Sequence, residues 1–350
     1  MIIAIHPDDY TAPGRPPESD AASPRWARLL QEAGHEVKWV DVRRPDILDQ
    51  LRDCDGFMWR WNHSRGMGRI ARRLLPVVER EMKLAVYPDQ NTCWHYDDKI
   101  AQAYLLKAAG IPIPQTWVWF DREKACAWAD EAQFPLVLKL ATGAASDNVV
   151  LVRNPQEANQ WIQRLFRRRV TSLNRSQFLP LDWKSRLTGA ARALLKGTRP
   201  TFADDGYEPQ VGYVLFQEFL PDNNHDTRVT VIGNRAFAYR RFNRPNDFRA
   251  SGSGNFSVKA EDIDPRFVRL AFSVARRIRS QSCAIDGMYR AGECVAGEIS
   301  YTYVSWMVHS CPGHWELQGE AADGELLWKS GQMWPEEAQV QDFLERLRSQ

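Results

Sequence analysis

The strongest constraint on the fold of this chain is a pair of short apolar segments, 286–289 and 295–300, joined by a tight glycine-containing turn. Two such segments around a turn predict a β-hairpin. Asp286 and Glu298 fall on the two paired strands, so that their carboxylates can converge. Ser300 comes two residues after Glu298 and shares its face, because side chains alternate along a strand. The sequence therefore predicts three oxygen side chains gathered on one rigid hairpin.

This set of side chains suggests a metal site. Converging hard oxygen ligands suit Mg²⁺, especially where a nucleotide supplies phosphate oxygens as further ligands. The predicted metal ligands are Asp286, Glu298 and Ser300. A surface hairpin with incidental acidic residues explains the same pattern, since short motifs often match by chance. The rest of the chain has to separate the two interpretations.

Six more segments follow one another in a definite order. They are an acidic helix start with Lys99 (97–99), an apolar strand ending in Lys139 (134–139), a small-residue loop and strand (141–152), a Gln-Glu-Phe-Leu strand (215–220), a strand with Arg228 (226–233) and an arginine-rich segment running into a glycine-containing loop (241–255). In this order they resemble the ATP-grasp superfamily, closest to its RimK-like branch of ribosomal-S6-modifying, glutamate-ligase-like proteins. The resemblance covers roughly residues 94 to 302.

The first 93 residues alternate between strand and helix patterns, which predicts a small parallel α/β sheet. The resemblance implies that residues 1–93 form the domain that precedes an ATP-grasp unit, in an α/β fold with an α+β clamp. Residues 94–213 would then be the nucleotide-binding lid, including an insertion at 160–199. Residues 214–350 would form the other half of the clamp, with the metal site and a terminal amphipathic helix. No Gly-x-Gly-x-x-Gly motif follows the first strand, which argues against a dinucleotide site.

The resemblance also implies a set of ATP-binding residues. Lys139 ends an apolar strand, where a buried cation needs an anion such as a phosphate. The small-residue loop 142–148 can bring backbone N–H groups against phosphates, although a plain β-turn explains this loop too. The backbone of 217–220 would pair with adenine, and Asp222 would contact the ribose, a role that Asn223 or Asn224 would also serve. A surface position is the alternative for the lysine at 99. The implied residues are Lys99, Lys139, Gly143, Ser146, Gln217, Glu218, Phe219, Leu220 and Asp222.

Three arginines are the implied catalytic residues: Arg228, Arg241 and Arg249. In the family, arginines at such positions grip the transferred phosphoryl group and a substrate carboxylate, for which the planar guanidinium fork is suited. Arg249 opens a loop whose glycines allow a substrate to approach closely. Ser300 departs from the family pattern, which has asparagine as third metal ligand. A second Mg²⁺ would then be bound more weakly or through water.

The resemblance implies an ATP-dependent carboxylate–amine ligase. The γ-phosphoryl group of ATP would pass to a carboxylate, and an amine would displace phosphate from the acyl-phosphate to leave an amide or peptide bond. The cofactors implied are ATP and one or two Mg²⁺, with Mn²⁺ as a substitute. Two alternatives remain: an ATP-grasp kinase that stops at a phosphorylated product, and a degenerate nucleotide-binding or regulatory protein.

The composition excludes some other classes of protein. Six cysteines are scattered without a Cys-x-x-Cys pair, which is typical of reduced thiols in the cytoplasm. No apolar run approaches the roughly 20 residues that span a bilayer, and the opening strand has no basic leader before it. The seven histidines form no metal-binding spacing. These features predict a cytoplasmic protein without a membrane segment.

The insertion at 160–199 is strongly basic, with ten Lys or Arg against one acidic residue. It is either a solvated helical excursion or an electropositive wall that attracts an anionic substrate. Nucleic acid is a weaker third option, because the net charge of +2 is small and no recognised module is present. The expected partners are therefore a small carboxylate and an amine, and the oligomeric state is not predicted. The basic residues are Arg164, Arg167, Arg168, Arg169, Arg175, Lys184, Arg186, Arg192, Lys196 and Arg199.

Overall fold

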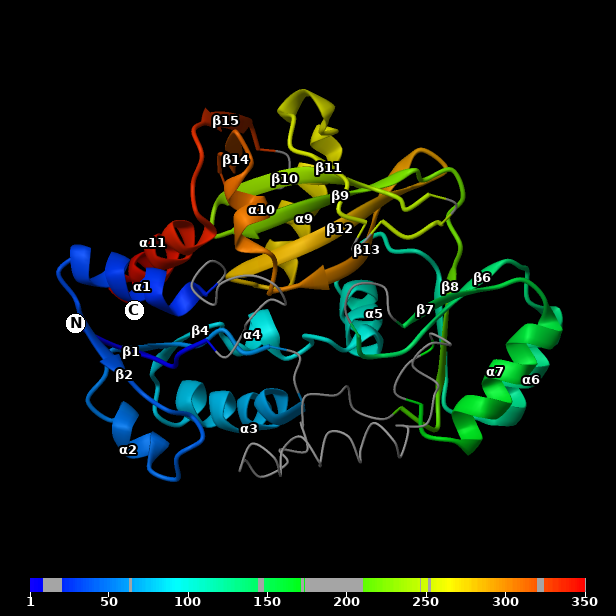
Figure 1. Ribbon diagram of the computed structural model, residues 1–350, viewed down its shortest axis with the longest axis horizontal. Coiled ribbons are helices and arrows are strands. Elements are labelled where there is room, and N and C mark those ends of the chain that lie inside the picture. The colour runs from blue at the N-terminus through cyan, green and yellow to red at the C-terminus, as the bar shows by residue number, and fades with distance from the viewer. Residues whose placement is uncertain are drawn as a thin grey trace, which may run out of the picture. The chain divides into compact units, whose positions relative to one another are not determined.

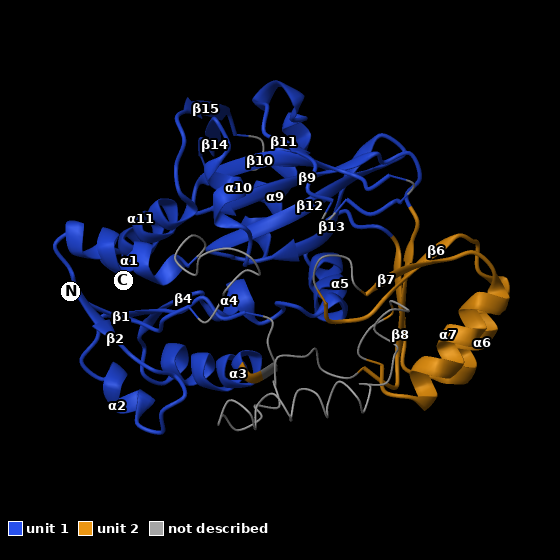
Figure 2. Cartoon of the chain, in the orientation of Figure 1, with its two compact units in different colours: residues 1–62, 67–114, 220–350 blue, residues 63–66, 115–219 orange. Residues whose placement is uncertain are grey.

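The computed structural model describes residues 1–8, 21–62, 65–143, 148–170, 173, 210–245, 247–250, 253–319 and 324–349. The chain divides into two compact units (Figure 2). Unit 1 contains residues 1–62, 67–114 and 220–350, and unit 2 contains residues 63–66 and 115–219. The predicted domain boundaries near residues 94 and 214 stay predictions. Within the described ranges, no helix is long and apolar enough to cross a membrane.

The first sheet of unit 1 is parallel and has the strand order β2-β1-β3-β4 (Figure 1). This confirms the α/β pattern predicted for the first 93 residues. The strands are β1 (Ile2–Ile5), β2 (Glu36–Trp39), β3 (Gly56–Met58) and β4 (Ala85–Tyr87), and the helices between them are α1 (Ala22–Glu32), α2 (Ile47–Leu51) and α3 (Arg65–Arg80).

The last helix of the chain, α11 (Pro335–Arg348), packs on this first sheet together with α1. Its apolar residues Phe343 and Leu344 join Ile3, Ile5 and the α1 side chains in one buried cluster. A Cβ atom at Gly56 would lie 2.8 Å from the Phe343 ring, so this close approach requires glycine. The amphipathic helix predicted from Trp334 onward is thereby confirmed.

The second sheet of unit 1 has the order β13-β12-β9-β10-β14-β15, with β11 paired to β10. Helix α9 (Pro265–Arg277) covers one face through apolar side chains that include Phe267 and Phe272. The predicted hairpin is present, and its two turn residues Ala291 and Gly292 have φ values of 49° and 87°, as a tight hairpin turn requires. The strands are β9 (His225–Ile232), β10 (Arg235–Phe242), β11 (Phe256–Ser257), β12 (Ser282–Arg290), β13 (Glu293–Ser300), β14 (Gly313–Leu317) and β15 (Leu326–Ser330).

Short helices complete unit 1: α4 (Gln90–Cys93), α5 (Lys99–Ala108), the 3₁₀ helix η3 (Ala260–Asp262) and α10 (Ser305–His309). Asp98 caps α5, since its Oδ1 accepts the N–H groups of Ile100 and Ala101 at 3.1 and 3.0 Å. The cap satisfies N–H groups that a helix start leaves without partners. It thereby fixes Lys99 at the first position of the helix.

Unit 2 is built on an antiparallel sheet with the order β5-β8-β6-β7. Its helices α6 (Arg122–Glu131) and α7 (Pro155–Arg167) pack on the sheet through small and branched side chains such as Ala129 and Ile162. The strands are β5 (Thr116–Trp119), β6 (Leu136–Lys139), β7 (Val149–Val152) and β8 (Val214–Glu218). Most of the predicted basic insertion lies outside the described residues.

Candidate functional site

A row of polar side chains crosses four neighbouring strands of the second sheet. Register places Glu298 of β13 opposite Asp286 of β12, Asp286 opposite Arg228 of β9, and Arg228 opposite Tyr239 of β10. Side chains that are directly opposite one another share a face and lie close together. The apolar residues of the other face pack on α9. The sheet therefore presents its chemistry on the face away from α9.

Two aspartates and two arginines on this face form a buried quartet: Asp226, Arg228, Arg241 and Asp286. Arg228 donates from Nε and Nη2 to the two oxygens of Asp286, at 2.6 and 2.8 Å. Arg241 donates to both oxygens of Asp226, at 2.8 and 2.6 Å. Nη2 of Arg241 also lies 2.7 Å from Oδ2 of Asp286. The quartet is thus one continuous chain of charge-assisted hydrogen bonds.

The two aspartates of the quartet respond differently to the same burial. Burial alone would raise the pKa of Asp286, but the charges and hydrogen bonds of Arg228 and Arg241 outweigh it and hold that pKa well below its ordinary value. Burial raises the pKa of Asp226, since Arg241 offsets it only in part and the charge of Asp286 adds to it. Asp286 is therefore the firmly ionised carboxylate of the pair.

Glu298 is the accessible carboxylate of the row. Its side chain is 40% exposed, whereas that of Asp286 is 13% exposed. Nζ of Lys99 lies 3.4 Å from its Oε1. The structure thus brings together a predicted metal ligand and a predicted ATP-binding lysine within unit 1.

Ser300 is engaged in a local turn. Its Oγ donates to the carbonyl oxygen of Thr302 at 2.8 Å and accepts the N–H of Thr302 at 3.2 Å. Thr302 in turn donates from Oγ1 to the hydroxyl of Tyr96 at 2.9 Å. These bonds use the only proton of Ser300 and one of its two lone pairs, so one lone pair is left for a metal or a water molecule.

The donor set of Asp286, Glu298 and Ser300 fits a magnesium ion that takes its remaining ligands from water and phosphate. A carboxylate has about four acceptor directions, and the arginines use three of those of Asp286. Glu298 adds an accessible carboxylate. In the described part of the chain, no group of three His, Cys, Asp or Glu side chains gathers as a metal cage. Mg²⁺ commonly binds through one or two carboxylates plus substrate phosphates.

Arg249, the third predicted catalytic arginine, lies in the loop after β10. Its guanidinium pairs with Asp247, with Nε 3.0 Å from Oδ1 and Nη2 2.6 Å from Oδ2. This hydrogen-bonded arginine lowers the pKa of Asp247. Both side chains are only partly buried. A partner two residues away can be exchanged for a ligand anion more easily than the buried quartet can be opened.

In unit 2, Lys139 is the last residue of β6 and precedes the small-residue loop. Gly143 has a φ of 128°, and a Cβ atom there would lie 2.5 Å from the side-chain nitrogen of Asn148. Asn148 ties the loop together, because its Nδ2 donates to the carbonyl oxygen of Thr142 at 2.8 Å. Gly143 is therefore required by the loop itself. Ser146 lies outside the described residues.

The predicted adenine hinge spans the boundary between the two units, with Gln217, Glu218 and Phe219 in unit 2 and Leu220 in unit 1. The N–H of Glu218 donates to the carbonyl of Gln115 at 2.8 Å, which leaves the predicted Glu218 carbonyl contact open to test.

The predicted ribose contact, Asp222, is exposed, with a φ of 64°. Asn223 is tied to β12 instead, since its side chain bonds the carbonyl and the N–H of Tyr289 at 2.9 and 2.8 Å. This favours Asp222 over Asn223 for the ribose.

Sequence reasoning missed two residues of this face, Asp226 and Tyr239. Each lies two positions before a predicted arginine on its strand, so strand period was the signal that placed them there. Tyr239 is fully buried, and burial raises its pKa. Its hydroxyl has no hydrogen-bond partner among the described residues.

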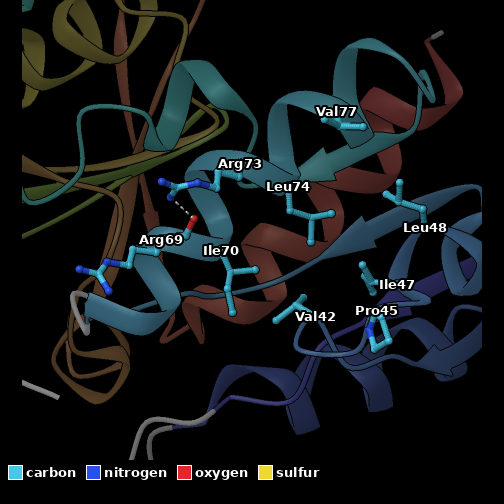
Figure 3. A pocket seen from close by; sticks show the side chains of 9 residues that line it. All are labelled: Val42, Pro45, Ile47, Leu48, Arg69, Ile70, Arg73, Leu74 and Val77. Atoms are coloured by element: carbon cyan, nitrogen blue, oxygen red, sulfur yellow. Dashed lines mark hydrogen bonds between the residues drawn. The ribbon is translucent and has the colours of Figure 1, made fainter. Parts of the chain in front are cut away.

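A separate groove of about 520 Å³ lies in unit 1 beside the first sheet (Figure 3). In Figure 3 the guanidinium groups of Arg69 and Arg73 extend away from the apolar side chains, and Nη1 of Arg73 donates to the carbonyl of Arg69 at 2.8 Å. No predicted site residue lines this groove. Its lining residues are Val42, Pro45, Ile47, Leu48, Arg69, Ile70, Arg73, Leu74 and Val77.

Comparison with known sequences places part of the chain in a recognised family. Residues 96–173 match the model of the RimK-like ATP-grasp domain. A D-alanine–D-alanine ligase of Synechococcus sp. (strain JA-2-3B'a(2-13)) is 30% identical over 147 residues, which is 39% of this chain and 43% of that protein. The match therefore spans less than half the length of this curated relative.

Solved structures extend the likeness to most of the chain. A RimK-domain ATP-grasp protein from Sphaerobacter thermophilus DSM 20745 has a TM-score of 0.50 and 16% identity, covering 89% of this chain and 95% of its own. D-alanine–D-alanine ligase from Bacillus anthracis, complexed with ATP, has a TM-score of 0.53 and 12% identity, covering 89% of both chains. At this level of identity the likeness concerns the fold.

Proposed function

From the ATP-grasp fold that this chain shares with those proteins, we propose that it is an ATP-dependent carboxylate–amine ligase of the cytoplasm. ATP would phosphorylate a small carboxylate substrate, and an amine would then displace phosphate, leaving an amide or peptide bond, ADP and phosphate. The observation that carries the proposal is the row of Glu298, Asp286 and Arg228 on one sheet face, with Lys99 paired to Glu298. All six cysteines are unpaired, which suits a reducing compartment.

Asp286 and Glu298 would hold Mg²⁺, with Ser300 as a direct or water-mediated third contact. The ion would neutralise phosphate charge during transfer. Lys99 would lie against the same phosphates because it already pairs with Glu298 at 3.4 Å. The rigid pairing of β12 and β13 fixes the two carboxylates relative to each other, so little rearrangement is needed when the nucleotide binds.

The arginines would act on the anions of the reaction. Arg228 and Arg241 are held in place by the quartet and offer their remaining N–H groups to phosphoryl oxygens or to the substrate carboxylate. Arg249 would exchange Asp247 for the phosphoryl group in transfer. Such catalysis consists of positioning and charge stabilisation, and it needs no protein nucleophile.

In unit 2, Lys139 and the loop at Gly143 would bind phosphates, and Gln217, Glu218 and Phe219 would contact the adenine. Leu220 and Asp222 of unit 1 would complete the adenine and ribose contacts. Residues 164–169 of the basic segment would attract an anionic carboxylate substrate by long-range charge. A non-catalytic nucleotide-binding protein is the second candidate, favoured by the engagement of Ser300 with Thr302.

The proposal is tested by ADP release from the full chain with Mg²⁺, ATP and panels of amino acids, other carboxylates and amines. A ligase releases ADP only when carboxylate and amine are both present, and mass spectrometry finds a product lighter than their sum by one water. A kinase releases ADP with one substrate and yields a product heavier by a phosphoryl group. ATP binding without ADP release for any pair would favour the non-catalytic candidate.

Lys139→Ala and Arg249→Ala should affect different steps. Loss of a charged hydrogen bond to a phosphate in Lys139→Ala should raise the Kd for ATP about ten- to a hundredfold. Arg249→Ala should leave that Kd nearly unchanged and lower kcat about a hundred- to a thousandfold, because its contact forms in the transition state. Calorimetry and ADP release measure the two quantities.

The control for Lys139 is Lys124→Ala, which removes an exposed lysine of the same unit that pairs with Asp121 at 4.0 Å. It should change neither quantity. If Arg249→Ala raised the Kd for ATP as Lys139→Ala does and left kcat intact, the catalytic role of Arg249 would be wrong.

Ser300→Asn restores the ligand that ATP-grasp proteins usually have. An amide oxygen reaches farther than the hydroxyl and accepts without donating, so we expect the Mg²⁺ concentration that gives half-maximal ADP release to fall several-fold. The measurement is a Mg²⁺ titration at saturating ATP. A drop in kcat without tighter Mg²⁺ binding would show instead that the bonds of Ser300 to Thr302 are what the site needs.

A further inference from the structure

Asp226 is a buried carboxylate for which the proposed chemistry has no part. It lies directly opposite Arg241 in the pairing of β9 with β10. Both N–H directions of the guanidinium fork point at it, at 2.8 and 2.6 Å. The side chains of Asp226 and Arg241 are only 13% and 7% exposed. The pair is therefore fixed by the register of the sheet and shielded from water.

Arg241 is shared between two carboxylates. Its Nη2 lies 2.6 Å from Oδ2 of Asp226 and 2.7 Å from Oδ2 of Asp286. Asp286 also receives the complete fork of Arg228. Among the described residues, Asp226 is therefore the carboxylate that keeps the second arginine from turning fully onto Asp286.

Charge counting shows what this sharing achieves. The quartet contains two arginines and two aspartates, so its net charge is zero when all four are ionised. Without the charge of Asp226, two arginines would surround one aspartate, and the net charge would be +1. A positive charge beside Asp286 opposes the binding of a cation there, and it does so strongly where water is excluded.

We propose that Asp226 is a positioning residue that holds Arg241 and balances its charge, so that Asp286 remains available to a divalent cation. The inference rests on the proposed function, because it assumes that Asp286 is a metal ligand. It predicts a specific effect on cation affinity, whereas a residue that only joined β9 to β10 would affect stability alone. Asp226 acts through Arg241 and touches no reacting atom in this scheme.

The experiment measures Mn²⁺ binding to the full chain in the presence of a non-hydrolysable ATP analogue, by electron paramagnetic resonance. Asp226→Asn should raise the Kd for Mn²⁺ about tenfold or more. Arg241→Gln should bind Mn²⁺ at least as tightly as the wild type, since it leaves the quartet with an excess negative charge. The double variant Asp226→Asn/Arg241→Gln is neutral again and should return to within about threefold of the wild-type Kd.

Glu316→Gln is the matched control, because Glu316 is a part-buried carboxylate of the same sheet whose nearest printed cation is His314 at 3.5 Å. It should leave the Kd for Mn²⁺ unchanged. Thermal unfolding of every variant is recorded alongside, so that affinity is compared between folded proteins only.

Three results would overturn the proposal. One is a folded Asp226→Asn variant with the wild-type Kd for Mn²⁺. Another is a double variant that binds Mn²⁺ as poorly as Asp226→Asn, which would indicate a purely structural role. If Asp226→Asn does not fold, Arg241→Gln decides, and weaker Mn²⁺ binding there refutes the charge argument. Failure of the wild type to bind Mn²⁺ with the analogue would instead refute the proposed metal site itself.

Discussion

Replacing Asp286 by asparagine should lower the free energy of unfolding by about 3 to 5 kcal/mol, because it leaves buried arginines without their counter-charge. Arg228 would lose the only carboxylate that its fork is shown to contact, at 2.6 and 2.8 Å. An asparagine can accept one hydrogen bond there but carries no charge. Chemical denaturation of the wild type and the variant measures the difference, and ADP release by the folded fraction should also be lost.

A control for this variant is Asp49→Asn, which removes an exposed aspartate that pairs with Arg52 at 2.9 Å on the surface. Exposed pairs of this kind contribute little to stability, so its denaturation curve should coincide with that of the wild type. If Asp286→Asn unfolded at the same denaturant concentration as the wild type, the quartet would not have the structural weight that its burial implies.

Glu298→Gln should show the opposite division: turnover lost and stability retained. We expect kcat to fall about a hundred- to a thousandfold or more, because the variant removes one of two charges that offset Mg²⁺ and phosphate. Its side chain is 40% exposed and its partner Lys99 lies 3.4 Å away, so folding loses only a partly solvated ion pair. ADP release and thermal unfolding, measured on the same preparation, separate the two effects.

Full activity in Glu298→Gln would refute the metal assignment for this hairpin. A large drop in its melting temperature would mean that Lys99 depends on the carboxylate to fold α5 correctly. Lys99→Met distinguishes these explanations, since it removes the same ion pair and leaves the carboxylate in place. It should weaken ATP binding and leave Mn²⁺ binding measurable.

The sequence was sufficient to predict the parts of the fold that local spacing controls. The hairpin of β12 and β13 follows from two apolar segments and a glycine turn, and the structure places Asp286 opposite Glu298. The strand–helix alternation of the first 93 residues gives the parallel sheet. The ATP-grasp fold inferred from the order of the segments is confirmed by the family match and the structural neighbours.

The sequence was not sufficient to show that the two carboxylates of the hairpin differ. Asp286 contacts Arg228, which is 58 residues earlier in the chain, and that contact depends on the pairing of β9 with β12. Such long-range register has no local signature, because any strand of the right period can lie beside any other. From the sequence, both substitutions would be expected to leave the fold intact; the structure assigns that outcome to Glu298 alone.

Ser300 and Asp226 illustrate the same limit at the level of single side chains. The sequence shows that Ser300 stands where asparagine is usual, but not that its hydroxyl is bonded to Thr302. It shows an aspartate two residues before Arg228, but not that this aspartate faces Arg241 on the next strand. Side-chain partners across strands are decided by packing, so they appear only once the sheet is assembled.

The packing of α11 on the first sheet has a consequence for the way this protein emerges from the ribosome. Phe343 fills the space above Gly56, and Gln339 accepts a hydrogen bond from the indole of Trp26 at 2.8 Å. One face of the first sheet to be synthesised is therefore covered by the last helix to be synthesised. Its apolar surface must wait, exposed or guarded by a chaperone, until translation is nearly complete. Vectorial folding cannot finish the N-terminal sheet first, and its final closure is post-translational.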